Sequence, residues 1–281
     1  MNCFHRIGFM QGRLSPIVDG RIQAFPWASW KDEFPIAEEV GIHRMEWTLD
    51  QERLYENPLL TKVGQTQIKE LCKRHSLTIP SLTGDCFMQA PLWKVKGEER
   101  AALERDFRAV IEGCAAVGIV MIVVPLVDNG RLENAEQEET LITFLESQTE
   151  YLISNGMNVV FESDFAPSEL ARFIGHLNPT FFGINYDIGN SAALGFDPAE
   201  EIASYGSRIM NVHIKDRLLG GTTVPLGTGS ADFETVFALL AKAGYDGNYI
   251  LQTARAIDGD HAGVLSRYRD MTIDWLKNNA A

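Results

Sequence analysis

Eight short apolar runs are spread along the whole chain, and segments with helical spacing separate them. The runs are RIGFM, HRMEWTL, TIPSLTG, VMIVVPLV, NVVFES, FGINYDI, IMNVHIK and NYILQT. Regular alternation of strand-like and helix-like segments is typical of an α/β fold, and nearly continuous apolar runs are typical of strands covered on both faces. Eight parallel strands close a barrel of about 250 residues. We therefore predict an α/β fold in which residues 1–281 form one (β/α)8 TIM barrel domain.

Helical periodicity is clearest before the fourth and fifth runs. The apolar positions are Phe107, Val110, Ile111, Cys114 and Val117 in one segment, and Leu141, Phe144, Leu145, Tyr151 and Leu152 in the other. Asp197 followed by Pro198 predicts a helix start, as does Asp232 before VFALLAKAG. Gly118 and Gly156 follow helical segments and predict left-handed helix ends.

Four polar residues fall near the ends of the last four apolar runs. They are Glu162, Asp187, His213 and Gln252, and the spacings between them are 25, 26 and 39 residues. Consecutive strand–helix units are about 30 residues long and lie side by side in a parallel sheet. Functional groups of barrels gather at the carboxyl ends of the strands. Any one of these residues alone would be read as a strand-end hydrogen-bonding group, but together they form a donor set for one Mn²⁺, Mg²⁺, Co²⁺ or Zn²⁺ ion.

The second half of the chain resembles a known family. The segments YDIGNSAALGFDP, NVHIKDRLLGGTTVPLGTGSADF and GYDGNYILQTAR are similar to the xylose-isomerase-like TIM barrels, and among these to the sugar-phosphate isomerases and epimerases of the hexulose-phosphate isomerase and L-ribulose-5-phosphate 3-epimerase type. The resemblance is densest over residues 158–256. It implies that Glu162, Asp187 and His213 bind one divalent metal ion and that Glu162 is the base that forms an enediolate from the sugar.

Gln252 departs from the pattern of that family. The resemblance implies a glutamate there, which would be both the fourth metal ligand and the second acid–base group of an epimerase. An amide can bind a metal through its oxygen but has no titratable proton near neutral pH. We therefore expect isomerisation, unless Glu46, Asp85 or Asp216 supplies the second proton. An inosose-dehydratase-like lyase and a sugar-binding barrel without turnover remain alternatives.

Several charged residues near strand ends are candidates for substrate binding. They are Lys215, Arg217, Glu46, Arg13 and Arg255, each of which could instead form an ordinary surface or barrel-mouth contact. The backbone amides of Gly227 and Gly229, close to the helix that begins near Asp232, are a further candidate for binding phosphate. More often, a stretch of this kind only forms a loop and caps the helix that follows it.

Composition narrows the class of partner. A formal net charge of −13 argues against nucleic acid, and by the same reasoning against an abasic-site endonuclease of this barrel type. No apolar stretch approaches the roughly 18 residues that span a bilayer, and the N-terminus has no signal-peptide pattern. We expect a cytoplasmic protein without membrane contact that binds a small sugar or sugar phosphate. The resemblance leaves room for a homo-oligomer.

Overall fold

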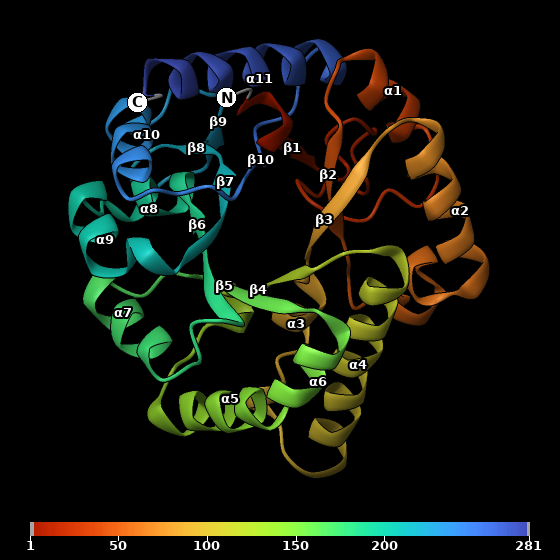
Figure 1. Ribbon diagram of the computed structural model, residues 1–281, viewed down its shortest axis with the longest axis vertical. Helices are drawn as coiled ribbons and strands as arrows, with labels where there is room; N and C mark the ends of the chain where they lie inside the picture. Colours follow the sequence, from red (N-terminus) through yellow and green to blue (C-terminus); the bar gives the residue numbers. More distant parts are fainter. Residues whose placement is uncertain (1–2, 280–281) are drawn as a thin grey trace.

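Parallel strands close into a barrel in the computed structural model, which describes residues 3–279. Within that range eight strands pair in the closed order β1-β10-β7-β6-β5-β4-β3-β2 (Figure 1). The strands are β1 Ile7–Met10, β2 Arg44–Thr48, β3 Thr78–Thr83, β4 Met121–Leu126, β5 Asn158–Ser163, β6 Phe182–Asp187, β7 Ile209–Ile214 and β10 Asn248–Leu251. A separate antiparallel hairpin consists of β8 Asp216–Arg217 and β9 Thr223–Val224. The predicted fold class is confirmed, while residues 1–2 and 280–281 of the predicted domain lie outside the described residues.

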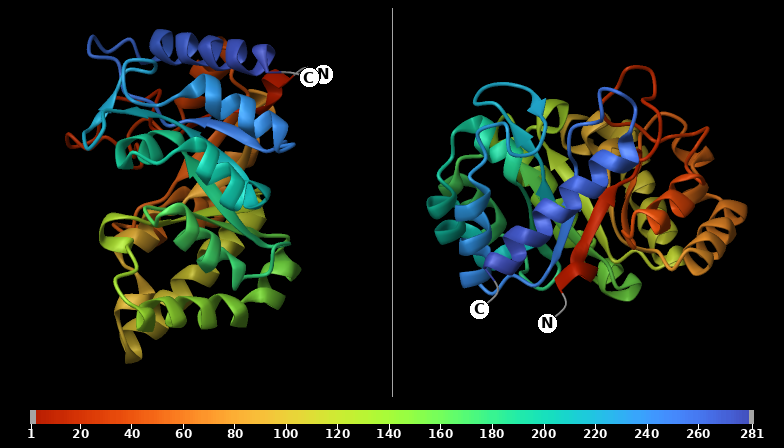
Figure 2. Two further views of the ribbon diagram at one scale, coloured as in Figure 1. Left: turned by 90° about the vertical axis from the view of Figure 1, so that its left-hand side faces the viewer. Right: turned by 90° about the horizontal axis from the view of Figure 1, so that it is seen from above.

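Helices surround the barrel, as Figures 1 and 2 show. They are α1 Glu33–Glu39, α2 Lys62–Arg74, α3 Asp85–Gln89, α4 Gly97–Val117, α5 Ala135–Ser147, α6 Thr149–Asn155, α7 Pro167–Gly175, α8 Ile188–Leu194, α9 Pro198–Tyr205, α10 Phe233–Lys242 and α11 His261–Asn278. Short 3-10 helices lie at Cys3–Arg6, Leu54–Glu56, Pro58–Leu60, Leu92–Lys94, Asp128–Gly130 and Gly206–Arg208. Between residues 3 and 279, no helix has both the length and the apolar character needed to cross a membrane.

The helix boundaries follow the local signals in the sequence. The Asp197 side chain accepts a hydrogen bond from the backbone N–H of Ala199 at 2.9 Å, with Pro198 in the first turn of α9. Gly118 and Gly156 end α4 and α6 with φ of 88° and 62°, a left-handed conformation that costs glycine little. The periodic segment before β5 is not one helix, because α5 ends at Ser147 and α6 starts again after Gln148.

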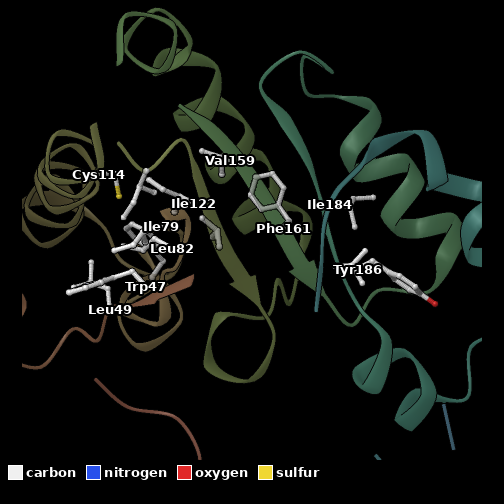
Figure 3. Close-up of a cluster of buried hydrophobic side chains, with 14 of the residues drawn as sticks. Trp47, Leu49, Ile79, Leu82, Cys114, Ile122, Val159, Phe161, Ile184 and Tyr186 are labelled. Carbon is white, nitrogen blue, oxygen red and sulfur yellow. The ribbon is translucent and has the colours of Figure 1, made fainter. Parts of the chain in front are cut away.

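The main core lies between the barrel strands and the helices. Strand side chains alternate, so Phe161 points outward while Val160 and Glu162 point into the barrel. Trp47 and Ile122 occupy the same outer layer as Phe161, and all three are fully buried (Figure 3). A second, small apolar cluster of Met121, Val123 and Val160 fills part of the interior. Toward the carboxyl ends of the strands the interior becomes polar, and this polar layer is the floor of the site.

Removing the Phe161 ring should test the outer core. Phe161 packs edge to face against Phe173 of α7 with ring centroids 5.3 Å apart. Phe161→Ala should lower the free energy of unfolding by about 3–5 kcal/mol, because it removes a fully buried ring and leaves a cavity. Urea denaturation followed by circular dichroism measures this loss. Ile153→Ala, at a half-exposed position of α6, should cost far less, and equal losses for the two variants would contradict the assigned core.

Candidate functional site

Three of the four predicted metal ligands meet at the carboxyl end of the barrel. Glu162 lies in β5, Asp187 ends β6, and His213 lies in β7. Asp187 is paired with His213 in the sheet, so the two side chains emerge on the same side. The ligand atoms of Glu162, Asp187 and His213 all lie within 4.8 Å of one another, and all three residues are buried. Gln252 follows β10 directly, and its side chain is turned toward Lys215.

The His213 ring is held between carboxylates on both of its nitrogens. Nε2 lies 2.7 Å from Glu46 Oε1, and Nδ1 lies 3.2 Å from Glu162 Oε2 and 4.0 Å from Asp187 Oδ2. Burial opposes the charged imidazolium, but Glu46 and Glu162 outweigh it and raise the pKa of His213 to about 10. Burial raises the pKa of Asp187, whereas His213 and Lys215 overcome the effect of burial and lower the pKa of Glu162.

Glu46 lies beneath the site and does not line the cavity. Its exposed fraction is 0%, because β2 continues to Thr48 and Glu46 therefore points into the barrel below the strand end. Its carboxylate accepts hydrogen bonds from Ser81 Oγ at 2.7 Å and Asn211 Nδ2 at 2.9 Å, and also from the Thr83 hydroxyl. A molecule in the cavity cannot reach this carboxylate, so the contact of Glu46 with His213 is the one relevant to the site.

Two asparagines that the sequence analysis did not single out complete the surroundings of Glu162. Asn185 Nδ2 lies 3.1 Å from Glu162 Oε2, and Asn190 Nδ2 donates to Glu162 Oε1 at 2.6 Å. The backbone N–H of Asn190 also donates to Asp187 Oδ1 at 2.8 Å. Asn185 stands two residues before Asp187 in an otherwise apolar strand, so the alternation of β6 already placed it on the inner face.

Lys215 connects Asp187 with Gln252. Its Nζ lies 2.7 Å from Asp187 Oδ2 and donates to Gln252 Oε1 at 3.0 Å. The amide nitrogen of Gln252 donates to Gln23 Oε1 at 2.9 Å, and Gln23 Nε2 donates to Asp85 Oδ2 at 2.7 Å. A chain of side chains thus runs from the triad to Asp85 at the start of α3.

A cavity of about 530 Å³ opens above these residues at the mouth of the barrel. Its wall includes Gln23, Asp85, Glu162, Lys215, Arg217 and Gln252. Among the predicted substrate-binding residues, Lys215 and Arg217 therefore face the cavity. Arg217 Nη1 donates to Asn190 Oδ1 at 2.9 Å, while its Nε and Nη2 donate to the carbonyl of Gly221.

Arg13 and Arg255 are absent from the wall of that cavity. Arg13 is buried and donates to the backbone carbonyls of Thr253 and Ile22. Arg255 donates to the carbonyls of Ser15 and Ile22. Both guanidinium groups therefore tie the loop after β1 to the segment after β10. They help to hold the backbone that forms the rim of the site.

The glycine loop after β7 is organised by a buried aspartate. Asp216 is almost fully buried and accepts hydrogen bonds from the backbone N–H groups of Gly227, Gly229 and Ala231 at 2.9, 2.8 and 3.2 Å. The backbone amides of Gly227 and Gly229, which were considered for phosphate binding, therefore already donate hydrogen bonds to Asp216. Asp216 is equally occupied, because its carboxylate serves the loop and does not line the cavity.

The triad suits a divalent cation. Two carboxylates and one imidazole offer three donor atoms in close proximity, and the buried Asp187 Oδ2 has the Lys215 ammonium 2.7 Å away as its nearest cation among the described residues. Glu46 accepts from the far nitrogen of His213, which is the arrangement that orients a metal-binding imidazole. Lys215 Nζ and Gln252 Oε1 lie on the open side of this triad.

A family model described as a xylose isomerase-like TIM barrel matches residues 21–274. Among curated proteins, L-ribulose-5-phosphate 3-epimerase UlaE of Escherichia coli strain K12 is 25% identical over 264 residues, covering 90% of each chain. These matches extend well beyond the segments that carry the resemblance in the sequence.

Solved structures of similar fold cover nearly the whole chain. The IOLI protein with a bound zinc atom has a TM-score of 0.76 at 15% identity, over 98% of this chain and 99% of that one. D-allulose 3-epimerase from Methylomonas sp. in complex with D-allulose has a TM-score of 0.74 at 15% identity, over 96% of both chains. At these identities the likeness concerns the fold.

The Asp216 carboxylate should protect the amides of the glycine loop. Asp216→Ala removes the acceptor of three backbone N–H groups, so the amides of Gly227 and Gly229 should exchange with deuterium faster by about 10-fold or more, since each lost bond is worth roughly 1.5–3 kcal/mol. Hydrogen exchange read by mass spectrometry measures this. In Asp232→Ala the same amides should keep their protection, because the Asp232 side chain accepts from the backbone N–H of Thr235 at the start of α10. Unchanged amide exchange in Asp216→Ala would contradict the role of Asp216 in holding this loop.

Proposed function

Because the chain belongs to the xylose isomerase-like TIM barrel family, we propose that it is a divalent-metal-dependent isomerase or epimerase of a small sugar or sugar phosphate. In this proposal Glu162 is the base that forms an enediolate. The observation that carries the proposal is the buried Glu162, Asp187 and His213 triad at the floor of an open cavity. A base beside a cation site is the arrangement that proton abstraction next to a carbonyl requires.

The protein is an enzyme that acts on a sugar or a sugar phosphate, as the family and the activities named for its relatives support. UlaE is named for a phosphorylated ketose, and the Methylomonas enzyme was solved with an unphosphorylated one. Both names describe inversion at carbon 3 of a ketose. A ketose or ketose phosphate is therefore the substrate class that we propose for this chain.

Each residue of the triad has a distinct task in this reaction. A divalent ion held by Glu162, Asp187 and His213 would polarise the carbonyl and stabilise negative charge on two adjacent substrate oxygens. Glu162 reaches the cavity, and hydrogen bonds from Asn185 and Asn190 keep its carboxylate in place. It removes a proton from the carbon next to the carbonyl. Glu46 acts through His213 as a positioning residue.

The open side of the triad holds the groups that we assign to substrate binding. Lys215 offers an ammonium group beside Asp187, and Arg217 offers a guanidinium at the cavity wall. Both suit hydroxyl oxygens or a phosphate. Gln252 lies between Lys215 and Gln23. We assign to its amide oxygen the binding of the metal or of a substrate hydroxyl.

Hydrogen exchange into the substrate tests the proposal. Metal-stripped protein is incubated in deuterated water with L-ribulose 5-phosphate or D-allulose, and Mn²⁺, Mg²⁺, Co²⁺ or Zn²⁺ is supplied separately. We expect metal-dependent incorporation of deuterium next to the carbonyl. Glu162→Gln should lower this rate by about 100-fold or more, because it removes the base.

A matched variant controls for this change. Glu169→Gln makes the same substitution on α7, outside the cavity, and should leave the exchange rate within about twofold because glutamine also serves at this position of a helix start. Exchange without added metal, or unchanged exchange in Glu162→Gln, would refute the proposed mechanism. Loss of water from the product would favour the lyase alternative, and tight sugar binding without exchange would favour a non-catalytic barrel.

The positioning role of Glu46 has its own test. Glu46→Gln leaves the cavity wall untouched but removes the negative charge that orients the His213 ring, so Mn²⁺ affinity should fall by about 10–100-fold. Titration calorimetry measures the affinity. Glu201→Gln changes another buried glutamate, which contacts Tyr186, Ser191 and Tyr205 and lies away from His213, and its affinity for Mn²⁺ should stay near that of the parent. Equal affinities for the two variants would rule out this role.

A further inference from the structure

Inversion of a carbon centre needs a second proton-transferring group, and the position directly after β10 does not provide one. Gln252 has no titratable proton there. Of the three alternatives raised by the sequence, Glu46 is sealed beneath His213 and is bonded to four side chains. The Asp216 carboxylate already accepts hydrogen bonds from three backbone amides of its loop. Neither carboxylate lines the cavity.

Asp85 differs from both because it lines the same cavity as Glu162. It is the first residue of α3, directly after β3 and the turn at Gly84, so its carboxylate emerges at the barrel mouth. Its exposed fraction is 7%, which means that it faces the cavity without being freely solvated. Its Oδ2 accepts one hydrogen bond, from Gln23 Nε2 at 2.7 Å.

The contacts of Gln23 place Asp85 one amide group away from Gln252. Gln23 Oε1 accepts from Gln252 Nε2 at 2.9 Å while its own Nε2 donates to Asp85. The Gln23 side chain therefore links the Gln252 amide to Asp85. Among residues 3–279, Asp85 is the only carboxylate that is hydrogen-bonded to Gln23 or Gln252. Glu162 approaches the cavity from β5, on the other side of β4 from Asp85.

We propose that Asp85 is the second acid–base residue of this cavity and that, together with Glu162, it lets the protein invert a carbon centre without a glutamate after β10. The inference rests on the proposed function. It adds to that function a ketose 3-epimerase activity in which the two proton carriers come from β5 and from the start of α3.

These two carboxyl groups, of Glu162 and Asp85, account for both proton transfers of the inversion. The Glu162 carboxylate takes the proton from carbon 3, and the electron pair of the broken C–H bond passes into the enediolate. Protonated Asp85 then gives its O–H proton to carbon 3 from the other face, and the electron pair returns to form the new C–H bond. Glu162 is left protonated and Asp85 ionised, and proton exchange with water restores both.

The surroundings of Asp85 suit a group that both gives and accepts a proton. Burial raises the pKa of Asp85 to about 7, and the carboxylates of Asp50 and Glu162 add to this. The hydrogen bond from Gln23 and the guanidinium of Arg13 act in the opposite direction and are outweighed. Near neutral pH both protonation states are populated, which is the condition for efficient general acid–base catalysis.

Separate measurement of exchange and inversion tests this role. The Mn²⁺-loaded protein is incubated with L-ribulose 5-phosphate or D-allulose in deuterated water. Deuterium at carbon 3 of the recovered ketose and formation of the 3-epimer are followed by NMR. The parent should show both. Asp85→Asn should keep exchange within about threefold, because Glu162 still forms the enediolate, and should lose epimer formation by about 100-fold or more.

Two further variants keep the result interpretable. Asp19→Asn makes the same change on the loop that carries Gln23, at a side chain that is 81% exposed, and should keep both signals. Adding Gln252→Glu to Asp85→Asn places a carboxyl group directly after β10 and should restore part of the epimer formation. Thermal unfolding of each variant shows whether the barrel is intact, and Asp85→Glu serves as a second probe of the position if the asparagine variant does not fold.

The outcomes separate this inference from the proposed function. An unchanged rate of epimer formation in Asp85→Asn, or an equal loss of exchange and inversion, would overturn the role of Asp85 alone. Exchange at carbon 3 without any epimer in the parent would do the same. Absence of both signals in the parent would overturn the role of Asp85. If deuterium is also absent from carbon 1, on the other side of the carbonyl, the proposed function falls as well.

Discussion

The contact between Glu46 and His213 joins β2 to β7 across the interior of the barrel, and the geometry of the site depends on it. A buried carboxylate is costly unless its oxygens are satisfied, and here Ser81, Thr83 and Asn211 contribute the remaining hydrogen bonds. Because Nε2 of His213 is fixed by Glu46, Nδ1 must face Glu162 and Asp187. The orientation of one ring thus follows from residues on strands that lie apart in the sheet.

The cavity combines two layers with different physical character. The floor is a buried polar network on β2, β3, β5, β6 and β7, where each charge has a fixed partner. The upper layer consists of Lys215, Gln252, Gln23 and Asp85, which are linked by single hydrogen bonds and border open space. A rigid floor and a more weakly tied upper layer suit a site that holds an ion firmly and exchanges its substrate.

Much of the architecture could be predicted because the strands are apolar on both faces and bounded by clear punctuation. Asp197 and Gly118 act locally, so their caps were visible in the sequence. The position of Glu46 was not, because it depends on β2 continuing to Thr48, which moves the carboxylate from the mouth into the interior. A helical pattern also gave no sign of the break between α5 and α6 at Gln148.

The site could be predicted where it depends on strand ends, and not where it depends on loops. Glu162, Asp187 and His213 follow from strand position and alternation, and Asn185 could have been found in the same way. Gln23 lies in the long loop after β1, which has no periodicity to place it beside Gln252. Arg13 and Arg255 were predicted to bind the ligand, but their guanidinium groups donate to backbone carbonyls. No sequence pattern marks such carbonyls.

Hydrogen bonds to the backbone hold the loop after β7, since Asp216 accepts from the amides of Gly227, Gly229 and Ala231. Its outward residues, such as Leu218 and Leu219, are exposed and take no part in that anchor. Mutations at these positions can therefore accumulate without altering the path of the chain. An evolving lineage could therefore change the outer surface of this loop while Arg217 and Gly220 keep their places at the cavity wall.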